Sequence, residues 1–150
     1  MIGAIVAKQQ VNQAFSLLNQ KRLDSFLSGW SDDALFHYPG QLTVSGTFAG
    51  REAIHSWFNV FFEQFSHIHF QLKHICVENL FDVVGNNNVI AYWDVALTNT
   101  QGLAVANTGT NLIKIRGRKV IEVRDFFFHQ ERLAQGWNEV HPLTNSPGSP

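Results

Sequence analysis

The chain has 150 residues, a formal net charge of -1 and 45% hydrophobic residues, which fits one globular domain with a buried core. The balanced charge and a pI of about 6.6 argue against a nucleic-acid or anionic-membrane partner. The single cysteine, Cys76, excludes an intrachain disulfide and fits a reducing, cytoplasmic setting. Because Cys76 lies in an apolar stretch, we expect a buried, unreactive thiol. Residues 1–7 lack the basic region of a signal peptide, and no segment reaches the ~20 apolar residues of a membrane-spanning helix.

The first half of the chain alternates between helical and extended patterns. Apolar residues near helical spacing predict helices over residues 5–18 and 21–30, followed by short strands over 34–38 and 42–48. The clearest helix spans residues 51–65. Its apolar side chains recur three and four residues apart and form one broad stripe: Ile54, Trp57, Phe58, Phe61, Phe62 and Phe65.

After this helix the hydrophobic period changes to two, which is the period of a strand. Four long strands are expected, over residues 68–78, 89–98, 103–116 and 120–129. Helices followed by strands indicate an α+β domain, in which the helices cover one face of a curved antiparallel sheet. We assign residues 1–143 to this single domain and residues 144–150, rich in Pro, Ser and Gly, to a disordered tail.

An ionisable residue interrupts the last apolar strand. Asp125 shares a strand face with Val123 and Phe127, whereas Glu122 and Arg124 lie on the opposite face. A carboxylate among apolar groups is costly unless it is paired or protonated, so the chain keeps it either for a buried hydrogen bond or for chemistry. Burial also raises a carboxyl pKa. Asp125 is therefore the leading candidate for a general acid/base.

The strand over residues 89–98 has two possible phases. One phase points Ile90, Tyr92, Asp94 and Ala96 toward the helices, and the other points the fully apolar set there, from Val89 to Leu97 in steps of two. Periodicity alone favours burying the apolar set. If that set instead faces outward, together with Phe126 and Phe128, it forms a patch that a second subunit must cover. We therefore expect a homodimer through the sheet face.

Three segments carry a resemblance to a known family. They are ALFHYPG at 34–40, SGTFAGREAI at 45–54 and VRDFF at 123–127, preceded by the two N-terminal helices. Together they resemble the nuclear transport factor 2-like superfamily, in particular its SnoaL-like polyketide cyclase branch. The resemblance covers about residues 5–135 and implies a cystatin-like cone: N-terminal helices on a strongly curved antiparallel or mixed sheet with a central pocket. Members include cyclases, isomerases, epoxide hydrolases, dehydratases and binding proteins, so the fold leaves function open.

The resemblance also implies roles for individual residues. The segment from Arg124 is similar to the Arg-Asp-Tyr-Phe segment of limonene-1,2-epoxide hydrolase, which implies that Asp125 acts on water or substrate. The resemblance also implies that Asp94 corresponds to the second inward carboxylate of the hydrolase. However, Tyr92 stands where the hydrolase has the arginine that bridges its two carboxylates. Tyr38 stands where ketosteroid isomerases have their aspartate base, and an unperturbed tyrosine is a poor base. Asn111 corresponds to the isomerase oxyanion donor.

We therefore expect a cofactor-independent acid/base enzyme of isomerase, cyclase or hydrolase type, acting on a small hydrophobic, cyclic or carbonyl-bearing molecule. Asp125 moves the proton, and Asp94 or His37 assists it. The expected substrate-binding residues are Tyr38, Tyr92, Asn111, Trp57, Phe61 and Phe127. The alternative is a non-catalytic small-molecule-binding or dimerisation module, in which these groups are merely satisfied by structural hydrogen bonds. His67 and His69 share a strand face, but no third ligand stands at a diagnostic spacing, so we predict no metal site.

Overall fold

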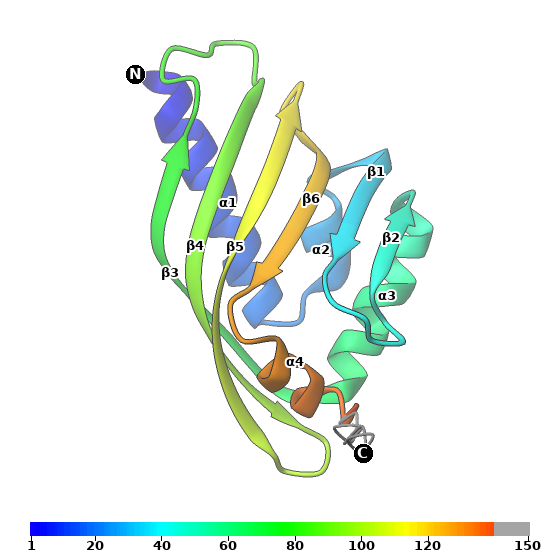
Figure 1. Cartoon of the computed structure of the whole chain (residues 1–150). Helices are drawn as coiled ribbons and strands as arrows, with labels where there is room; N and C mark the ends of the chain where they lie inside the picture. Colours follow the sequence, from blue (N-terminus) through cyan, green and yellow to red (C-terminus); the bar gives the residue numbers. More distant parts are fainter. Residues whose placement is uncertain (140–150) are drawn as a thin grey trace, which may run out of the picture.

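A six-stranded mixed sheet wraps around helices from the N-terminal half in the computed structural model, which describes residues 1–139 (Figure 1). The predicted α+β class is thus confirmed. The tail expected over residues 144–150, and the domain limit at 143, lie outside the described residues. No helix within 1–139 is both long and apolar enough to cross a membrane. In chain order the elements are α1 (Ile2–Asn19), α2 (Leu23–Leu27), β1 (Trp30–Tyr38), β2 (Gly46–Ala49), α3 (Arg51–Gln64), β3 (Phe65–Val77), β4 (Asn87–Asn99), β5 (Ala104–Arg116), β6 (Lys119–Phe127) and α4 (Gln130–Gly136).

The strands follow the order β2-β1-β6-β5-β4-β3 across the sheet. Neighbouring strands are antiparallel except for β1 and β6, which run parallel and place Phe36 beside Val123. This pairing brings the first strand of the chain next to the last, so it joins the aromatic segment at 34–38 to the strand that carries Asp125. In Figure 1 the helix α1 crosses the sheet on the side that we call the inner face.

Helix α3 anchors the aromatic core. Gly50 precedes it with a φ of 88°, a left-handed conformation that glycine adopts without strain. The apolar stripe predicted for this helix is buried at Ile54, Trp57, Phe58 and Phe61. Its rings pack on Phe36 of β1, with centroid separations of 5.3 Å for Phe58 and 4.8 Å for Trp57. This packing fixes α3 against the β1 edge of the sheet.

The predicted helix over residues 21–30 is too long. Helix α2 ends at Leu27, and Trp30 already belongs to β1. The guanidinium of Arg51 holds the start of β1, since Nη2 donates to the Trp30 carbonyl over 2.6 Å and pairs with Asp32 at 2.9 Å. Trp30 packs against Phe26 with a centroid separation of 5.5 Å, so its ring is buried although the residue belongs to a strand and not to the helix. Tertiary contacts, rather than helical spacing, decide where this helix stops.

Two further expectations fail in the second half of the chain. Cys76 is exposed, because it lies on the face of β3 that points away from the helices; the prediction of a core thiol is wrong. The short helix α4 was not predicted. It packs on the end of the sheet where Gly136 lies against Phe65 and Val105, so close that a methyl at Gly136 would sit 3.1 Å from Val105.

Candidate functional site

A cavity of about 940 Å³ lies between the helices and the inner face of the sheet. Helix α1 and the α2 segment form one side, and β5, β6 and β1 form the floor. Most of the walls are aromatic or aliphatic, including Phe15, Phe26, Trp30, Phe36, Ile113 and Val123. The volume falls in the range of small-molecule sites, which are mostly apolar with a few placed polar groups.

Three polar side chains from the sheet reach this cavity. Asp125 on β6, Asn111 on β5 and Tyr38 on β1 all line it. Register explains the first two, because Asn111 lies directly opposite Asp125 in the β5–β6 pair. The expectation that both residues face the helices is therefore confirmed. Tyr38 joins them because β1 runs beside β6.

A hydrogen-bond chain orients the Asp125 carboxylate. The indole Nε1 of Trp93 donates to Asn111 Oδ1 over 2.6 Å, and Asn111 Nδ2 donates to Asp125 Oδ1. An indole N–H can only donate, so it fixes the carbonyl side of the Asn111 amide toward Trp93. The amide nitrogen must then face Asp125. Oδ1 is held as an acceptor, and a proton on this carboxyl group is carried by the other oxygen, Oδ2.

The surroundings of Asp125 favour its neutral form. Asp125 is half-buried, and its neighbours on the floor of the cavity are Val123 and Phe127, both buried. Burial raises the pKa of Asp125 from 3.8 to about 7, and the hydrogen bond from Asn111 opposes part of this rise. Near neutral pH the residue can therefore both accept and donate a proton, which is the property of a general acid/base.

The hydroxyl of Tyr38 is held at the same end of the cavity. Its oxygen accepts a hydrogen bond of 3.0 Å from Trp137 Nε1. Burial raises the pKa of Tyr38 above its ordinary value; the Trp137 hydrogen bond opposes this, and the charge of Asp125 adds to it. Tyr38 consequently keeps its proton and serves as a donor rather than a base. A protonated phenol at this place can donate a hydrogen bond to a carbonyl oxygen in the cavity.

The three aromatic residues expected in the walls line the cavity. Trp57 stacks on Phe61 with a centroid separation of 5.5 Å, and Phe127 meets Tyr38 edge-on at 5.7 Å. Trp57 also donates its indole N–H to the Val44 carbonyl over 2.9 Å, which fixes the ring. These rings give the cavity a rigid wall with faces available for stacking.

Two residues expected in the pocket lie on the opposite, outer face of the sheet. Strand β4 buries Val89, Ala91 and Trp93, so the phase that directs Asp94 and Tyr92 inward is wrong. Asp94 is about half exposed, accepts a hydrogen bond of 2.8 Å from Thr108 and pairs with Lys73 at 3.4 Å. Tyr92 stacks on His74 at 5.9 Å. Burying the apolar set removes more hydrophobic surface from water and leaves the carboxylate solvated, which explains the observed phase.

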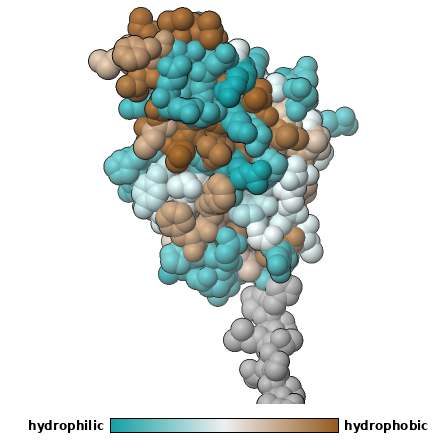
Figure 2. All heavy atoms as spheres, turned by 45° about the horizontal axis from the view of Figure 1, so that its top comes forward, coloured by the Kyte–Doolittle hydropathy of each residue, from teal (hydrophilic) through white to brown (hydrophobic). Residues whose placement is uncertain are grey.

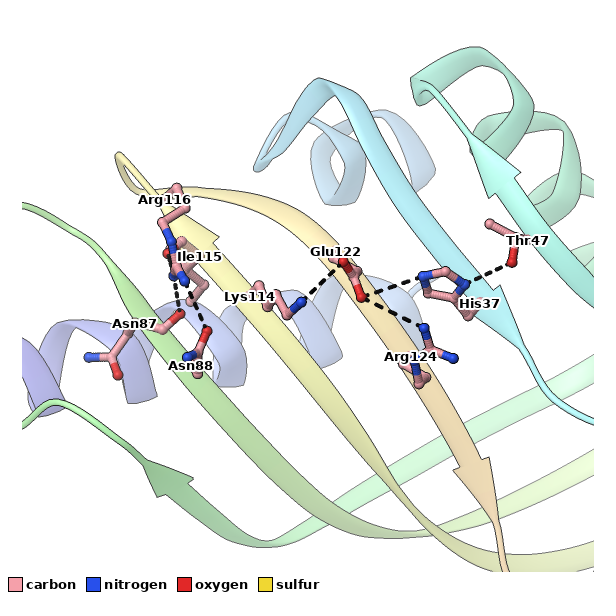
Figure 3. A network of polar contacts seen from close by, with 9 residues as sticks. All are labelled: His37, Thr47, Asn87, Asn88, Lys114, Ile115, Arg116, Glu122 and Arg124. Carbon is pink, nitrogen blue, oxygen red and sulfur yellow. Dashed lines mark hydrogen bonds and ion pairs between the residues drawn. The ribbon is translucent and has the colours of Figure 1, made fainter.

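His37 also lies on the outer face, since it alternates with the buried Phe36 and Tyr38 (Figure 3). Its Nδ1 is 2.8 Å from Thr47 Oγ1, and its Nε2 is 3.5 Å from Glu122 Oε1. In Figure 3, Arg124 contacts the same Glu122 oxygen as His37, and Lys114 contacts the other oxygen from the opposite side. His37 therefore belongs to a polar network on the outer face, and the expectation that it assists Asp125 is wrong.

Trp93 and Trp137 are the polar contributors that sequence reasoning did not identify. The sequence pattern placed Trp93 in the apolar set of its strand and gave no role to Trp137. The available signal was the indole N–H, which needs an acceptor when the ring is buried. Trp93 fits beneath β5 only because residue 109 is glycine: a methyl group there would lie 2.6 Å from the Trp93 ring. Within residues 1–139 no group of three metal-ligating side chains occurs.

The sheet and helices together form a cone-shaped α+β fold that surrounds a mostly apolar cavity. Residues 11–124 match the SnoaL-like domain family. Because the match spans well over half of the chain, the protein belongs to the SnoaL-like family of the nuclear transport factor 2-like superfamily, which includes isomerases, cyclases and dehydratases. The matched range ends directly before Asp125. No protein of curated function matches the sequence.

Solved structures confirm the fold. Bal32a, from a soil-derived mobile gene cassette, has 18% sequence identity and a TM-score of 0.79, covering 90% of this chain and 98% of its own. An NTF2-like protein of unknown function from Burkholderia pseudomallei has 10% identity and a TM-score of 0.76, covering 87% and 95%. TerC, crystallised with polyporic acid, has 13% identity and a TM-score of 0.73, covering 89% and 98%. At these identities the similarity concerns the fold alone.

Proposed function

We propose that the cavity binds a small hydrophobic, cyclic or carbonyl-bearing molecule and that Asp125 moves a proton on it without a cofactor. The observation that carries this proposal is a carboxyl group with a pKa of about 7 in an apolar cavity, oriented by a hydrogen-bond chain from Trp93 through Asn111. The presence of polyporic acid in the TerC crystal supports a small-molecule ligand for this fold. The cytoplasmic setting expected from the sequence is part of the same proposal.

The reaction that fits these groups is enolisation. Oδ2 of ionised Asp125 accepts a proton from the carbon next to the substrate carbonyl, and the C–H electron pair becomes the carbon–carbon double bond of the enolate. The hydroxyl of Tyr38 donates a hydrogen bond to the developing oxygen anion. In an isomerisation, Asp125 then returns the proton to a different carbon of the conjugated enolate. In a cyclisation, the enolate carbon instead attacks a second carbonyl of the same molecule, and Asp125 gives its proton to the alkoxide that results. Asn111 donates one of its two amide hydrogens to Asp125, which leaves the other for the substrate oxygen.

Isomerase or cyclase chemistry is favoured over epoxide hydrolysis. The hydrolase pattern needs a second carboxylate beside the first, and Asp94 lies on the other face of the sheet with Lys73. His37 is likewise occupied by Thr47 and Glu122. Asp125 is therefore the single carboxylate among the residues that line the cavity. One residue must serve as base and then as acid, which suits a proton transfer that starts and ends on the same molecule.

The first experiment is a thermal-shift screen of hydrophobic ketones, lactones, epoxides and polycyclic phenols, because a ligand of the folded state raises the melting temperature. Each hit is then incubated with the protein in deuterated water, and exchange of the protons next to the carbonyl is followed by NMR. We expect exchange with the wild type, loss of exchange with Asp125→Asn while binding persists, and retention with the matched control Asp94→Asn. Undiminished exchange in Asp125→Asn would rule out the assignment.

The outer face of the sheet supports the second candidate function, a dimerisation module. Ile90, Phe126 and Phe128 are exposed on this face with 45–55% of their surface in contact with solvent. The apolar set of β4, which the sequence argument assigned to this surface, is buried, so the argument for an interface rests on these three side chains alone. We propose a homodimer that packs these faces together. Sedimentation should give a dimer for the wild type and a monomer for Phe128→Glu; a monomeric wild type contradicts the dimer.

A further inference from the structure

One end of the molecule carries apolar side chains that no other part of the described chain covers. Figure 2, in which the top of Figure 1 comes forward, shows apolar surface gathered at this end. The exposed side chains come from the start of α1 and from the loop 78–86 between β3 and β4, and they are Ile2, Ile5, Leu80, Phe81, Val83 and Val84. We call this set the apolar tip. Phe81 and Val83 are the most exposed, at 72% and 79%.

The apolar tip is held in place by backbone contacts. Helix α1 packs so closely on the loop that a methyl group at Gly3 would lie 2.3 Å from the Asp82 carbonyl oxygen. The Asp82 carboxylate accepts hydrogen bonds from the backbone N–H groups of Val84 and Gly85, at 3.2 and 2.9 Å. The N–H of Arg118, in the β5–β6 turn, donates to the Gly85 carbonyl over 2.9 Å. Three segments therefore meet at this end, and the loop is ordered with its apolar side chains pointing outward.

Basic side chains surround the tip. Lys8 on α1 and Arg116, Arg118 and Lys119 around the β5–β6 turn lie at this end. Within residues 1–139 none of the four forms an ion pair, whereas Arg51, Lys73, Lys114 and Arg124 elsewhere do. The Nζ of Lys119 donates to the Ser28 carbonyl, and Arg116 donates to the Asn87 carbonyl, so neither charge is neutralised.

The carboxylates of the same end do not cancel this charge. Asp82 is engaged by the loop amides, and Glu78 accepts a hydrogen bond from Asn88. These donors are neutral, so both carboxylates keep their charge, and the four cations exceed the two anions by two. The end of the molecule is locally positive although the whole chain has a net charge of -1.

We propose that the apolar tip docks onto an anionic lipid surface. Exposed Phe, Ile and Val side chains enter the boundary between headgroups and acyl chains, while the surrounding Lys and Arg side chains contact lipid phosphates. The combination of aliphatic tip and unpaired cations matches this partner in both chemistry and charge. The net charge of the chain predicted no membrane partner, because the average conceals a local cluster.

The docked orientation brings the cavity close to the lipid. Val6 and Gln10 line the cavity, and Gln10 Nε2 donates to the Arg118 carbonyl over 2.9 Å, so the tip and the cavity share the α1 border. An apolar ligand dissolved in the lipid reaches the cavity without crossing bulk water. Docking itself does not depend on Asp125 or on any reaction, and its test measures lipid binding alone.

The test is co-sedimentation of the full chain with vesicles of phosphatidylcholine containing about 30% phosphatidylserine, compared with phosphatidylcholine alone. We expect binding to the anionic vesicles that weakens in about 0.5 M salt, where charges are screened within a few Å. Arg118→Glu and Lys119→Glu should each lower the partition coefficient about fivefold or more. The double variant Phe81→Ser/Val83→Ser should lower it at least about tenfold.

Leu103→Ser is the matched control, because Leu103 is also exposed, at 45%, but lies in the connection at the other end of β4. It should bind vesicles like the wild type, and all variants should keep the wild-type melting temperature. Absence of binding by the wild type overturns the proposal, as does an equal loss in Leu103→Ser. A change of oligomeric state in Phe81→Ser/Val83→Ser also overturns it, since a second copy of the chain then covers the tip.

Discussion

Replacing Asp125 with asparagine should stabilise the protein, and more so above neutral pH than in acid. The native carboxyl has a pKa of about 7, against an unperturbed value of 3.8. Because the folded-state pKa is raised, the native protein holds a proton that the unfolded chain releases, so wild-type stability falls as pH rises from about 4 to about 7 and then levels off. A shift of about three units at about 1.36 kcal/mol each gives a limit of about 4 kcal/mol.

Asparagine removes this penalty at every pH while keeping the acceptor oxygen that Asn111 contacts. Part of the penalty is already present at pH 5, and water that enters the cavity solvates the wild-type anion, so we expect the advantage of Asp125→Asn to grow by about 1–2.5 kcal/mol between about pH 5 and pH 8. Urea unfolding of both proteins at the two pH values measures this difference in the free energy of unfolding. Subtracting the wild-type value from the variant value at each pH cancels the contribution of all other titrating groups.

Asp94→Asn is the control for this comparison, because it makes the same chemical change on the exposed outer face. Its stability difference from the wild type should stay within about 1 kcal/mol, as expected for an exposed ion pair with Lys73. If Asp125→Asn gains no more between the two pH values than this control does, the carboxyl is not desolvated and the acid/base reasoning fails.

Two further substitutions probe the support of the site. Asn111→Leu removes the hydrogen bond that lowers the Asp125 pKa, so carboxyl NMR should show that pKa moving above about 7. It also leaves the Trp93 N–H without its acceptor, which should cost about 1–3 kcal/mol in urea unfolding; a downward pKa shift contradicts the assigned role. Gly109→Ala places a methyl 2.2 Å from the Phe126 carbonyl oxygen and 2.6 Å from the Trp93 ring, so it should cost about 1–3 kcal/mol or more. Gly29→Ala, whose methyl would meet nothing closer than 3.7 Å, is its control, and equal melting temperatures for the two variants would refute the packing argument.

Secondary structure was largely predictable where one period persists over many residues. The stripe from Ile54 to Phe61 gave helix α3, and the four long strands followed from alternation. Boundaries failed where a local pattern competed with packing. Trp30 continues the helical spacing of α2, yet it begins β1 because Arg51 binds its carbonyl and Phe26 packs on its ring. Helix α4 is short and gave no periodic signal of its own.

The candidate site divides in the same way. Asp125 was placed correctly because its own strand contains Glu122 and Arg124, which identify the solvated face. Asp94 was misplaced because both phases of its strand were apolar enough to bury, and the resemblance outweighed the periodicity. The structure shows that Asp94 lies on the outer face. There its carboxylate pairs with Lys73 and accepts a hydrogen bond from Thr108, both of which lie on neighbouring strands.

The sequence by itself thus determined the α+β class, the family and the inward direction of Asp125, because alternation and helical spacing are local properties of the chain. Tertiary structure alone decided the parallel pairing of β1 with β6, the chain of hydrogen bonds from Trp93 to Asp125, and the gathering of the apolar tip with its basic rim. Each of these depends on which distant segments become neighbours. That choice is made by the total burial of apolar surface and the pairing of polar groups across the whole fold, which no local pattern records.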